Sequence, residues 1–138
     1  MKEYLIAGVV AGVLAAIINN IYHLTYSGVT GVEVPQVINV LTVSFASLIP
    51  LVLASLAYYF LAENTKQPTV IFVIMTIFLT ICSMGMMAVP VFPNRDAVPE
   101  GFYGLALPMH FIAGGIAAIF IPQYVAYREN KLKVKEHA

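Results

Sequence analysis

Four long stretches without a single formal charge constrain this chain more than any other feature of its sequence. They cover roughly residues 4–26, 36–62, 68–89 and 102–127, and every Lys, Arg, Asp and Glu lies in the short segments outside them. A helix of about 20 apolar residues crosses a hydrocarbon core of about 30 Å. Because each stretch is long enough, we predict an all-α, polytopic membrane protein, an antiparallel bundle of four transmembrane helices.

The composition agrees with this fold class and excludes others. Hydrophobic residues make up 60% of the chain and charged residues 10%, whereas soluble domains average about 45–50% and 25%. An ordinary soluble domain and a disordered chain are excluded, and the lipid bilayer becomes the principal partner. The net charge is zero, so no basic field points to nucleic acid. We expect one domain, residues 1–138, whose first stretch is too long for a signal peptide and is retained.

The basic residues are distributed unevenly between the two ends of such a bundle. If the helices alternate in direction, six of the seven fall on one side and Arg95 stands alone on the other. The six are Lys2, Lys66, Arg128, Lys131, Lys133 and Lys135. Because short cytoplasmic segments carry an excess of Lys and Arg, we predict that both termini are cytoplasmic, with a basic tail at residues 128–138.

Small residues mark the helix faces that we expect to touch, because close packing drives helix association in hydrocarbon. On a helical wheel, the small and polar residues of the first stretch share an arc of about 120°. The packing candidates are Gly8, Gly12 and Ala16 in the first stretch, and Gly114 and Ala118 in the fourth. The GxxxG pattern of Gly8 and Gly12 leaves three uses open: a homo-oligomer, a larger membrane complex, or packing within the monomer.

The second stretch carries a proline in its middle. Pro50 cannot donate a hydrogen bond to the Ala46 carbonyl, so we expect a kink there. Three serines lie on one side of this stretch, at positions 44, 47 and 55. A serine can help to satisfy the freed carbonyl in a membrane.

A set of polar residues falls in the half of the predicted bundle that faces away from the cytoplasm. It comprises Asn19, Asn20, His23, Asn39, Thr80, Ser83 and His110. Buried polar groups in a membrane are costly and need partners. Two interpretations remain open: hydrogen bonds between helices, or a semi-polar ligand-binding pocket in the outer half of the bundle.

The same region offers a metal or haem site as an alternative. Its candidate ligands are His23, His110, Met84, Met87 and Met109. Thioether and imidazole ligands suit copper(I), and two histidines on different helices can ligate a haem iron. Methionine is also a common filler of apolar interiors, so we expect no cofactor, with copper or haem as the alternatives. The single cysteine, Cys82, excludes an intramolecular disulfide and a thiolate zinc cluster.

The apolar stretches lack the groups that enzymes and coupled transporters ordinarily use. No carboxylate or basic side chain lies within them, so only the histidines can titrate there. No serine–histidine–aspartate set can be assembled, and we predict no catalytic residues. The leading hypothesis is a non-enzymatic binding or accessory protein. The alternatives are a metal- or haem-binding protein that uses His23 and His110, and a small oligomeric transporter or channel subunit.

Three short motifs suggest a relationship. They are the Gly/Ala-rich first stretch with Asn20 near its end, the segment Leu48-Ile49-Pro50-Leu51, and Met109-His110 followed by Ala113-Gly114-Gly115. With these motifs, nearly the whole chain resembles small bacterial four-helix integral membrane proteins catalogued as a domain of unknown function. The resemblance implies the same fold and a bacterial plasma membrane. It implies no activity and no functional residues.

Overall fold

The computed structural model is all-helical and describes residues 1–31, 38–87 and 101–136, without the side chains of residues 86, 87, 135 and 136. The helices are α1 (Lys2–Thr30), α2 (Val40–Asn64), α3 (Pro68–Met87) and α4 (Phe102–Glu136). All four are long and apolar enough to cross a membrane, which confirms that part of the sequence prediction. Arg95 and its loop lie outside the described residues.

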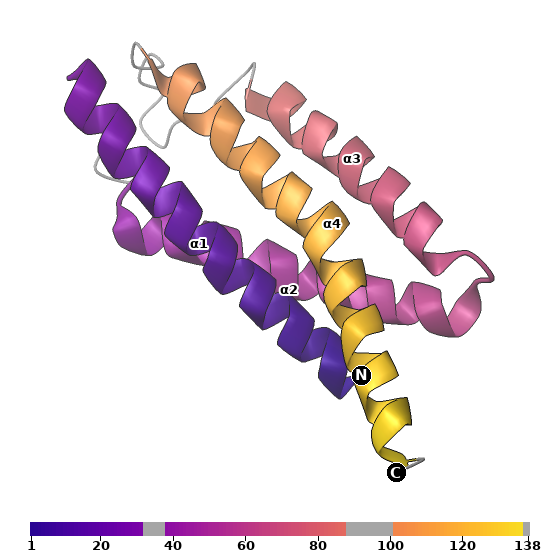
Figure 1. Ribbon diagram of the computed structural model, residues 1–138. Coiled ribbons are helices and arrows are strands. Elements are labelled where there is room, and N and C mark those ends of the chain that lie inside the picture. The colour runs from indigo at the N-terminus through magenta and orange to yellow at the C-terminus, as the bar shows by residue number, and fades with distance from the viewer. Residues whose placement is uncertain (32–37, 88–100, 137–138) are drawn as a thin grey trace.

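Consecutive helices run in opposite directions (Figure 1). Each helix contacts its neighbours in the order α1, α2, α3, α4 and back to α1, and α2 also contacts α4. In Figure 1, the axes of α1, α3 and α4 are nearly aligned, with α4 opposite in chain direction to α1 and α3, and α2 crosses behind them at a clear angle. We call the end that carries Met1, Glu136 and the short α2–α3 connection the terminal end, and the end that carries Gly31 and Gly101 the loop end.

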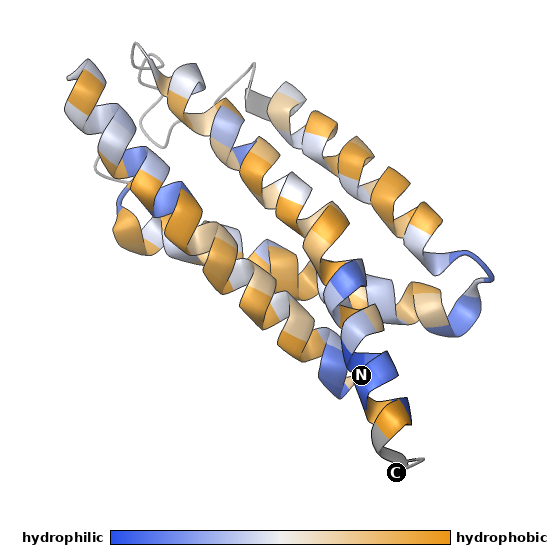
Figure 2. Cartoon of the chain, viewed as in Figure 1, coloured by the Kyte–Doolittle hydropathy of each residue, from blue (hydrophilic) through white to orange (hydrophobic). Residues whose placement is uncertain are grey.

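The outside of the helices is apolar, as expected of a protein that lipid surrounds. Large side chains such as Ile21, Phe45, Phe78 and Phe111 are each more than half exposed. Figure 2 shows that hydrophilic residues gather instead at the terminal end, around the N-terminus, the α2–α3 connection and the last turns of α4. Exposed apolar surface on this scale is unusual for a monomer in water.

The GxxxG pattern of α1 packs within the chain, against α2. A Cβ atom added to Gly8 would overlap Ser55, and one added to Gly12 would lie 2.7 Å from Leu48 Cδ1 and 2.9 Å from Leu48 Cα. These distances are too short for non-bonded carbon atoms. The two glycines therefore let the α1 and α2 backbones approach closely, and this pair of helices has the most extensive contact in the described chain.

A hydrophobic core extends from the middle of the helices to the terminal end. Its buried members are Ala7, Ala11, Ala15, Leu51, Tyr58, Phe72, Ala117, Ile121 and Val125. The Tyr58 ring centroid lies 4.8 Å from that of Phe72 and 5.5 Å from that of Tyr4. The Tyr58 hydroxyl is 2.8 Å from Thr69 Oγ1, which joins α2 to α3. Large aromatic side chains thus fill this end of the protein.

Charged side chains join the first and last helices at the terminal end. Arg128 Nε donates to Glu3 Oε2 at 2.7 Å. Both groups lie outside the charge-free stretches. Their hydrogen bond lowers the pKa of Glu3 and raises the pKa of Arg128, because it favours the charged form of each group.

The basic tail continues α4 as a helix. The sequence places the end of the fourth stretch at Tyr127, whereas the helix runs on to Glu136. Charges end an apolar stretch, but they do not end a helix whose backbone is satisfied internally. The extension brings Glu129 within 3.2 Å of the Tyr4 hydroxyl, which donates to its carboxylate.

At the loop end, two tyrosines of α1 bind backbone carbonyls at the start of α4, one inside the helix and one just before it. The Tyr22 hydroxyl donates to the Gly104 carbonyl at 2.6 Å, and the Tyr26 hydroxyl donates to the Gly101 carbonyl at 2.9 Å. Pro108 lies inside α4 and cannot bond the carbonyl four residues earlier, which is that of Gly104. Tyr22 supplies the missing donor. A Cβ atom at Gly104 would overlap the Tyr26 hydroxyl, so the glycine gives the Tyr26 ring the space it occupies here.

Candidate ligand cavity

An open cavity of about 620 Å³ lies between α2 on one side and α3 and α4 on the other, from the middle of the helices toward the loop end. Its wall residues Ala46, Pro50 and Leu79 are exposed. Small residues leave this space, among them Ala46 and Ala54 of α2, and Ala106, Ala113 and Ala117 of α4. Most of the remaining wall is aliphatic or aromatic. The polar side chains in the wall are Asn19, Thr42, Ser47, Thr76, Thr80, Ser83 and His110.

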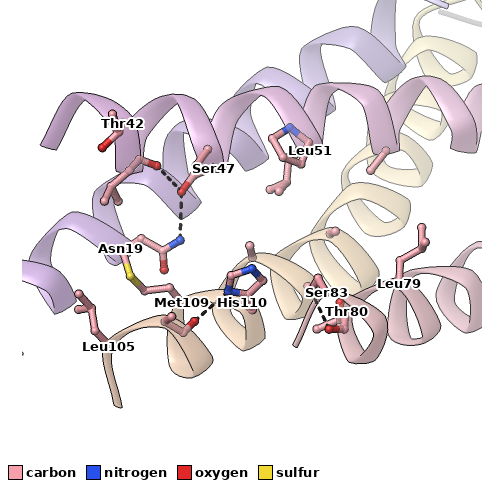
Figure 3. A pocket seen from close by; sticks show the side chains of 18 of the residues that line it. Asn19, Thr42, Ser47, Leu51, Leu79, Thr80, Ser83, Leu105, Met109 and His110 are labelled. Atoms are coloured by element: carbon pink, nitrogen blue, oxygen red, sulfur yellow. Dashed lines mark hydrogen bonds between the residues drawn. The ribbon is translucent and has the colours of Figure 1, made fainter. Parts of the chain in front are cut away.

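Asn19 is, with Ser47, one of the two most buried polar side chains in the wall; each has 3% of its surface exposed. Its amide donates from Nδ2 to Ser47 Oγ at 3.0 Å, and Ser47 Oγ donates to the Val43 carbonyl at 2.8 Å (Figure 3). The one hydroxyl proton of Ser47 is used in the second bond, because a carbonyl can only accept. The amide nitrogen must therefore face Ser47. Asn19 Oδ1 is left buried, without a partner among the described residues.

His110 lines the cavity from α4. Its Nδ1 lies 2.8 Å from the Ala106 carbonyl, and since the carbonyl has no proton, Nδ1 must carry one. In a neutral imidazole the other ring nitrogen, Nε2, is then an acceptor. Figure 3 shows the ring standing between α4 and α2, with that second nitrogen directed toward α2 across the cavity.

On the α3 side, two hydroxyls are bonded to their own helix. Thr80 Oγ1 donates to the Thr76 carbonyl at 2.8 Å, and Ser83 Oγ donates to the Thr80 carbonyl at 2.7 Å. Thr80 also contacts α4 closely, since a Cβ atom on Gly114 would overlap its hydroxyl. Gly114 of the predicted packing set therefore packs on α3, whereas Gly8 and Gly12 pack on α2.

Pro50 and Ala46 both line the cavity, and the helix continues through them. Because Pro50 has no N–H, the Ala46 carbonyl loses its helical donor. The bond of Ser47 goes to Val43, so Ser47 does not satisfy the freed carbonyl as the sequence suggested. Ala46, a residue of the cavity wall, thus has a carbonyl without its helical donor.

Asn20, although adjacent to Asn19, lies outside the cavity. It lines a second groove of about 540 Å³, formed by α1 and α2 alone. Its Nδ2 donates to the Ala16 carbonyl at 2.8 Å and to Ser44 Oγ at 3.0 Å. Neighbouring residues on a helix point about 100° apart, so the two asparagines serve different surfaces. Ala16 of the predicted packing set lines the same groove.

Asn39 has a structural role at the start of α2. Its side chain accepts from the Leu41 and Thr42 backbone N–H groups at 3.0 and 3.1 Å, and the Asn39 N–H is bonded to Thr42 Oγ1. This reciprocal pattern is a capping box. Asn39 is exposed and does not line the cavity. The sequence placed it inside a span because the helix begins at Val40, later than the apolar stretch does.

His23 is buried in α1, with 7% of its surface exposed, but it does not line the cavity. Its Nδ1 has no partner among the described residues. Of the seven polar candidates, the cavity brings together Asn19, Thr80, Ser83 and His110.

The candidate metal ligands are divided in the same way. His110 and Met109 line the cavity, while His23 and Met84 do not. The Met87 side chain lies outside the described part of the chain. Within the described residues, no group of three or more His, Cys, Asp or Glu side chains could hold a metal ion.

Sequence reasoning missed Ser47 as a site residue. It recognised the serine face of the second stretch, and Ser47 is the partner that fixes the orientation of Asn19. The pairing depends on the crossing of α1 and α2, which no spacing in the sequence reveals. Ala118 of the predicted packing set is half-buried in α4.

Fold and cavity together define a small all-helical protein whose four helices are long and apolar enough to cross a membrane. No protein-family model matches this sequence, and neither a curated protein nor a solved structure matches it. The function must therefore be argued from the residues of this chain.

Proposed function

We propose that this chain is a multi-pass protein of the plasma membrane that binds an apolar small molecule or lipid in the cavity between α2, α3 and α4. It acts as a binding or accessory protein without catalysis of its own. The observation that carries the proposal is the 620 Å³ cavity, whose wall includes Asn19, a residue with a buried and unpartnered Oδ1.

The size and lining of the cavity support a ligand site. Ligand pockets are usually about 300–1,000 Å³, mostly apolar, with a few polar groups that orient the ligand. The space here lies within that range. An unbonded polar atom in a buried site costs about 1–3 kcal/mol, so a ligand that bonds Asn19 would recover part of that cost.

The distribution of charge supports the orientation. The terminal end carries Lys2, Lys66 and the basic last turns of α4, and positive charge marks the cytoplasmic side. Both termini then lie in the cytoplasm, and the cavity lies toward the outer leaflet. The resemblance to small bacterial four-helix proteins favours the plasma membrane.

The test uses a medium-chain alkanol that carries a photoreactive diazirine, added to the protein in liposomes. Adducts mapped by peptide mass spectrometry should be saturable at cavity residues such as Leu105 and Met109. Ala46→Phe should fill the cavity and remove these adducts. Ala57→Phe is the matched control, because Ala57 is an exposed alanine of the same helix that lines neither cavity nor groove. Adducts that persist unchanged in Ala46→Phe would refute the proposal.

A further inference from the structure

Four of the five hydroxyls in the cavity wall already donate their proton to the protein. Those of Thr42, Ser47, Thr80 and Ser83 are donated to backbone carbonyls three or four residues earlier in the chain. Each hydroxyl has one proton and two lone pairs. What these side chains can still offer to a ligand is therefore a lone pair.

The remaining polar atoms of the wall are acceptors as well. Asn19 Oδ1 is buried and unpartnered, because the amide nitrogen of Asn19 is bonded to Ser47. The Nδ1 of His110 faces the Ala106 carbonyl, so in the neutral form of the ring Nε2, which is directed toward α2, is an acceptor. The carbonyl of Ala46 is freed by Pro50. The residues that carry these acceptors come from three helices, α1, α4 and α2, and all three line one space.

Two further facts define the ligand class. Lys, Arg, Asp and Glu are absent from the described lining of the cavity, so neither an anion nor a cation finds an opposite charge there. Burying an unpaired charge is far more costly than burying a neutral polar group. Thr76 is the exception among the hydroxyls: its side chain makes no hydrogen bond within the described residues, so one donor can still rotate toward the cavity.

On the basis of the proposed cavity function, we infer that the site selects neutral apolar molecules that carry a hydrogen-bond donor, such as long-chain alcohols, phenols or amides. The apolar part of the ligand lies among the alanine and leucine side chains of the wall. Its O–H or N–H group donates to Asn19 Oδ1 or His110 Nε2. Ketones and ethers of the same length bring only acceptors and leave both atoms unbonded.

The experiment measures how well three competitors protect the cavity residues from labelling by the diazirine alkanol. The competitors are decanol, its methyl ether and decanone. Each competitor is compared at equal concentration in the membrane, determined separately by partition into protein-free liposomes. We expect decanol to protect the cavity adducts at an about three- to tenfold lower concentration than the ether or the ketone, which is the range for one hydrogen bond.

Two variants test whether the preference for decanol depends on the acceptors Asn19 Oδ1 and His110 Nε2. Asn19→Leu and His110→Phe should each reduce the preference for decanol, with little change in protection by the ether. Asn20→Leu is the matched control, because Asn20 is also an α1 asparagine bonded to an α2 serine but lies outside the cavity. Its preference for decanol should equal that of the unmodified protein.

The outcomes separate the two proposals. If all three competitors protect equally, donor selection is refuted while cavity binding stands. If adducts are not saturable in the unmodified protein, cavity binding itself is refuted. A preference that survives in both Asn19→Leu and His110→Phe, or that disappears equally in Asn20→Leu, would overturn the assignment to these acceptors. The competitor series on the unmodified protein tests donor selection even if a variant fails to fold.

Discussion

The same four helices build a filled terminal end and a hollow loop end, and the difference lies in the size and polarity of a few side chains. At the terminal end, Tyr4, Tyr58 and Phe72 form a continuous aromatic contact. Toward the loop end, alanines occupy the corresponding wall positions of α2 and α4, and the cavity takes the place of a core. Under the proposed function, the filled end contributes most to stability and the hollow end binds the ligand.

The largest expected effect is a loss of stability when a buried aromatic side chain of the filled end is truncated. Phe72→Ala should lower the free energy of unfolding by about 3–5 kcal/mol, as for other buried aromatic residues, because Phe72 is 3% exposed. Phe78→Ala is the matched control on the same helix, since Phe78 is 64% exposed, and it should change stability little. Thermal unfolding in detergent measures both. Equal losses for the two variants would contradict the packing of α3 described above.

A second expected effect concerns the close contact of α1 with α2. Gly12→Val should destabilise the protein by about 1–3 kcal/mol through overpacking, because its Cβ would press on the backbone of Leu48. Gly115→Val is the control, since nothing lies within 4 Å of a Cβ atom at Gly115. If detergent-solubilised Gly12→Val unfolds at the same temperature as the control, the α1–α2 contact is not as close as the structure indicates.

At the loop end, the expected effect is smaller. Tyr22→Phe removes the donor to the Gly104 carbonyl and should cost about 1 kcal/mol, because Pro108 supplies no substitute. Tyr103→Phe is the control, since the Tyr103 side chain is 40% exposed and makes no hydrogen bond within the described residues. Equilibrium unfolding compares the two. If Tyr22→Phe leaves the free energy of unfolding unchanged, the Gly104 carbonyl finds another donor, such as water.

The smallest expected effect belongs to the partly buried ion pair of Glu3 and Arg128. The pKa of Glu3 is lowered from its ordinary value of 4.5 by the bond to Arg128. The pair therefore stabilises the folded protein above that pH, and the contribution is lost as the pH falls through the lowered pKa. Melting temperatures measured from neutral pH down to acid should drop less in Glu3→Gln than in the unmodified protein. Glu63→Gln, at an exposed glutamate, should behave like the unmodified protein.

The number of helices and their approximate bounds could be predicted because charge-free length is a direct consequence of bilayer thickness. The close-packing role of Gly8 and Gly12 could also be predicted, since small residues at a spacing of four form a flat helix face. Their partner could not, because α1 contacts both α2 and α4. A pattern on one helix does not say which neighbour it meets.

The polar candidates show that the sequence alone could not predict which polar side chains line the cavity. Asn19 and Asn20 have the same chemistry and adjacent positions, yet only Asn19 reaches the cavity. That outcome depends on the angle at which α2 crosses α1, a property of the whole assembly. The prediction that Asn39 lines the pocket was wrong for another reason. A polar residue at the edge of an apolar stretch can cap a helix as well as line a pocket.

The hydroxyls of Tyr22 and Tyr26 bind carbonyls that lie 82 and 75 residues later in the chain. α1 therefore depends on α4, which is synthesised later, for these two hydrogen bonds, whereas its contacts with α2 need only residues 2–64. Assembly can therefore follow an order in which the α1–α2 hairpin forms early. The loop end is completed only when α4 has joined the other helices.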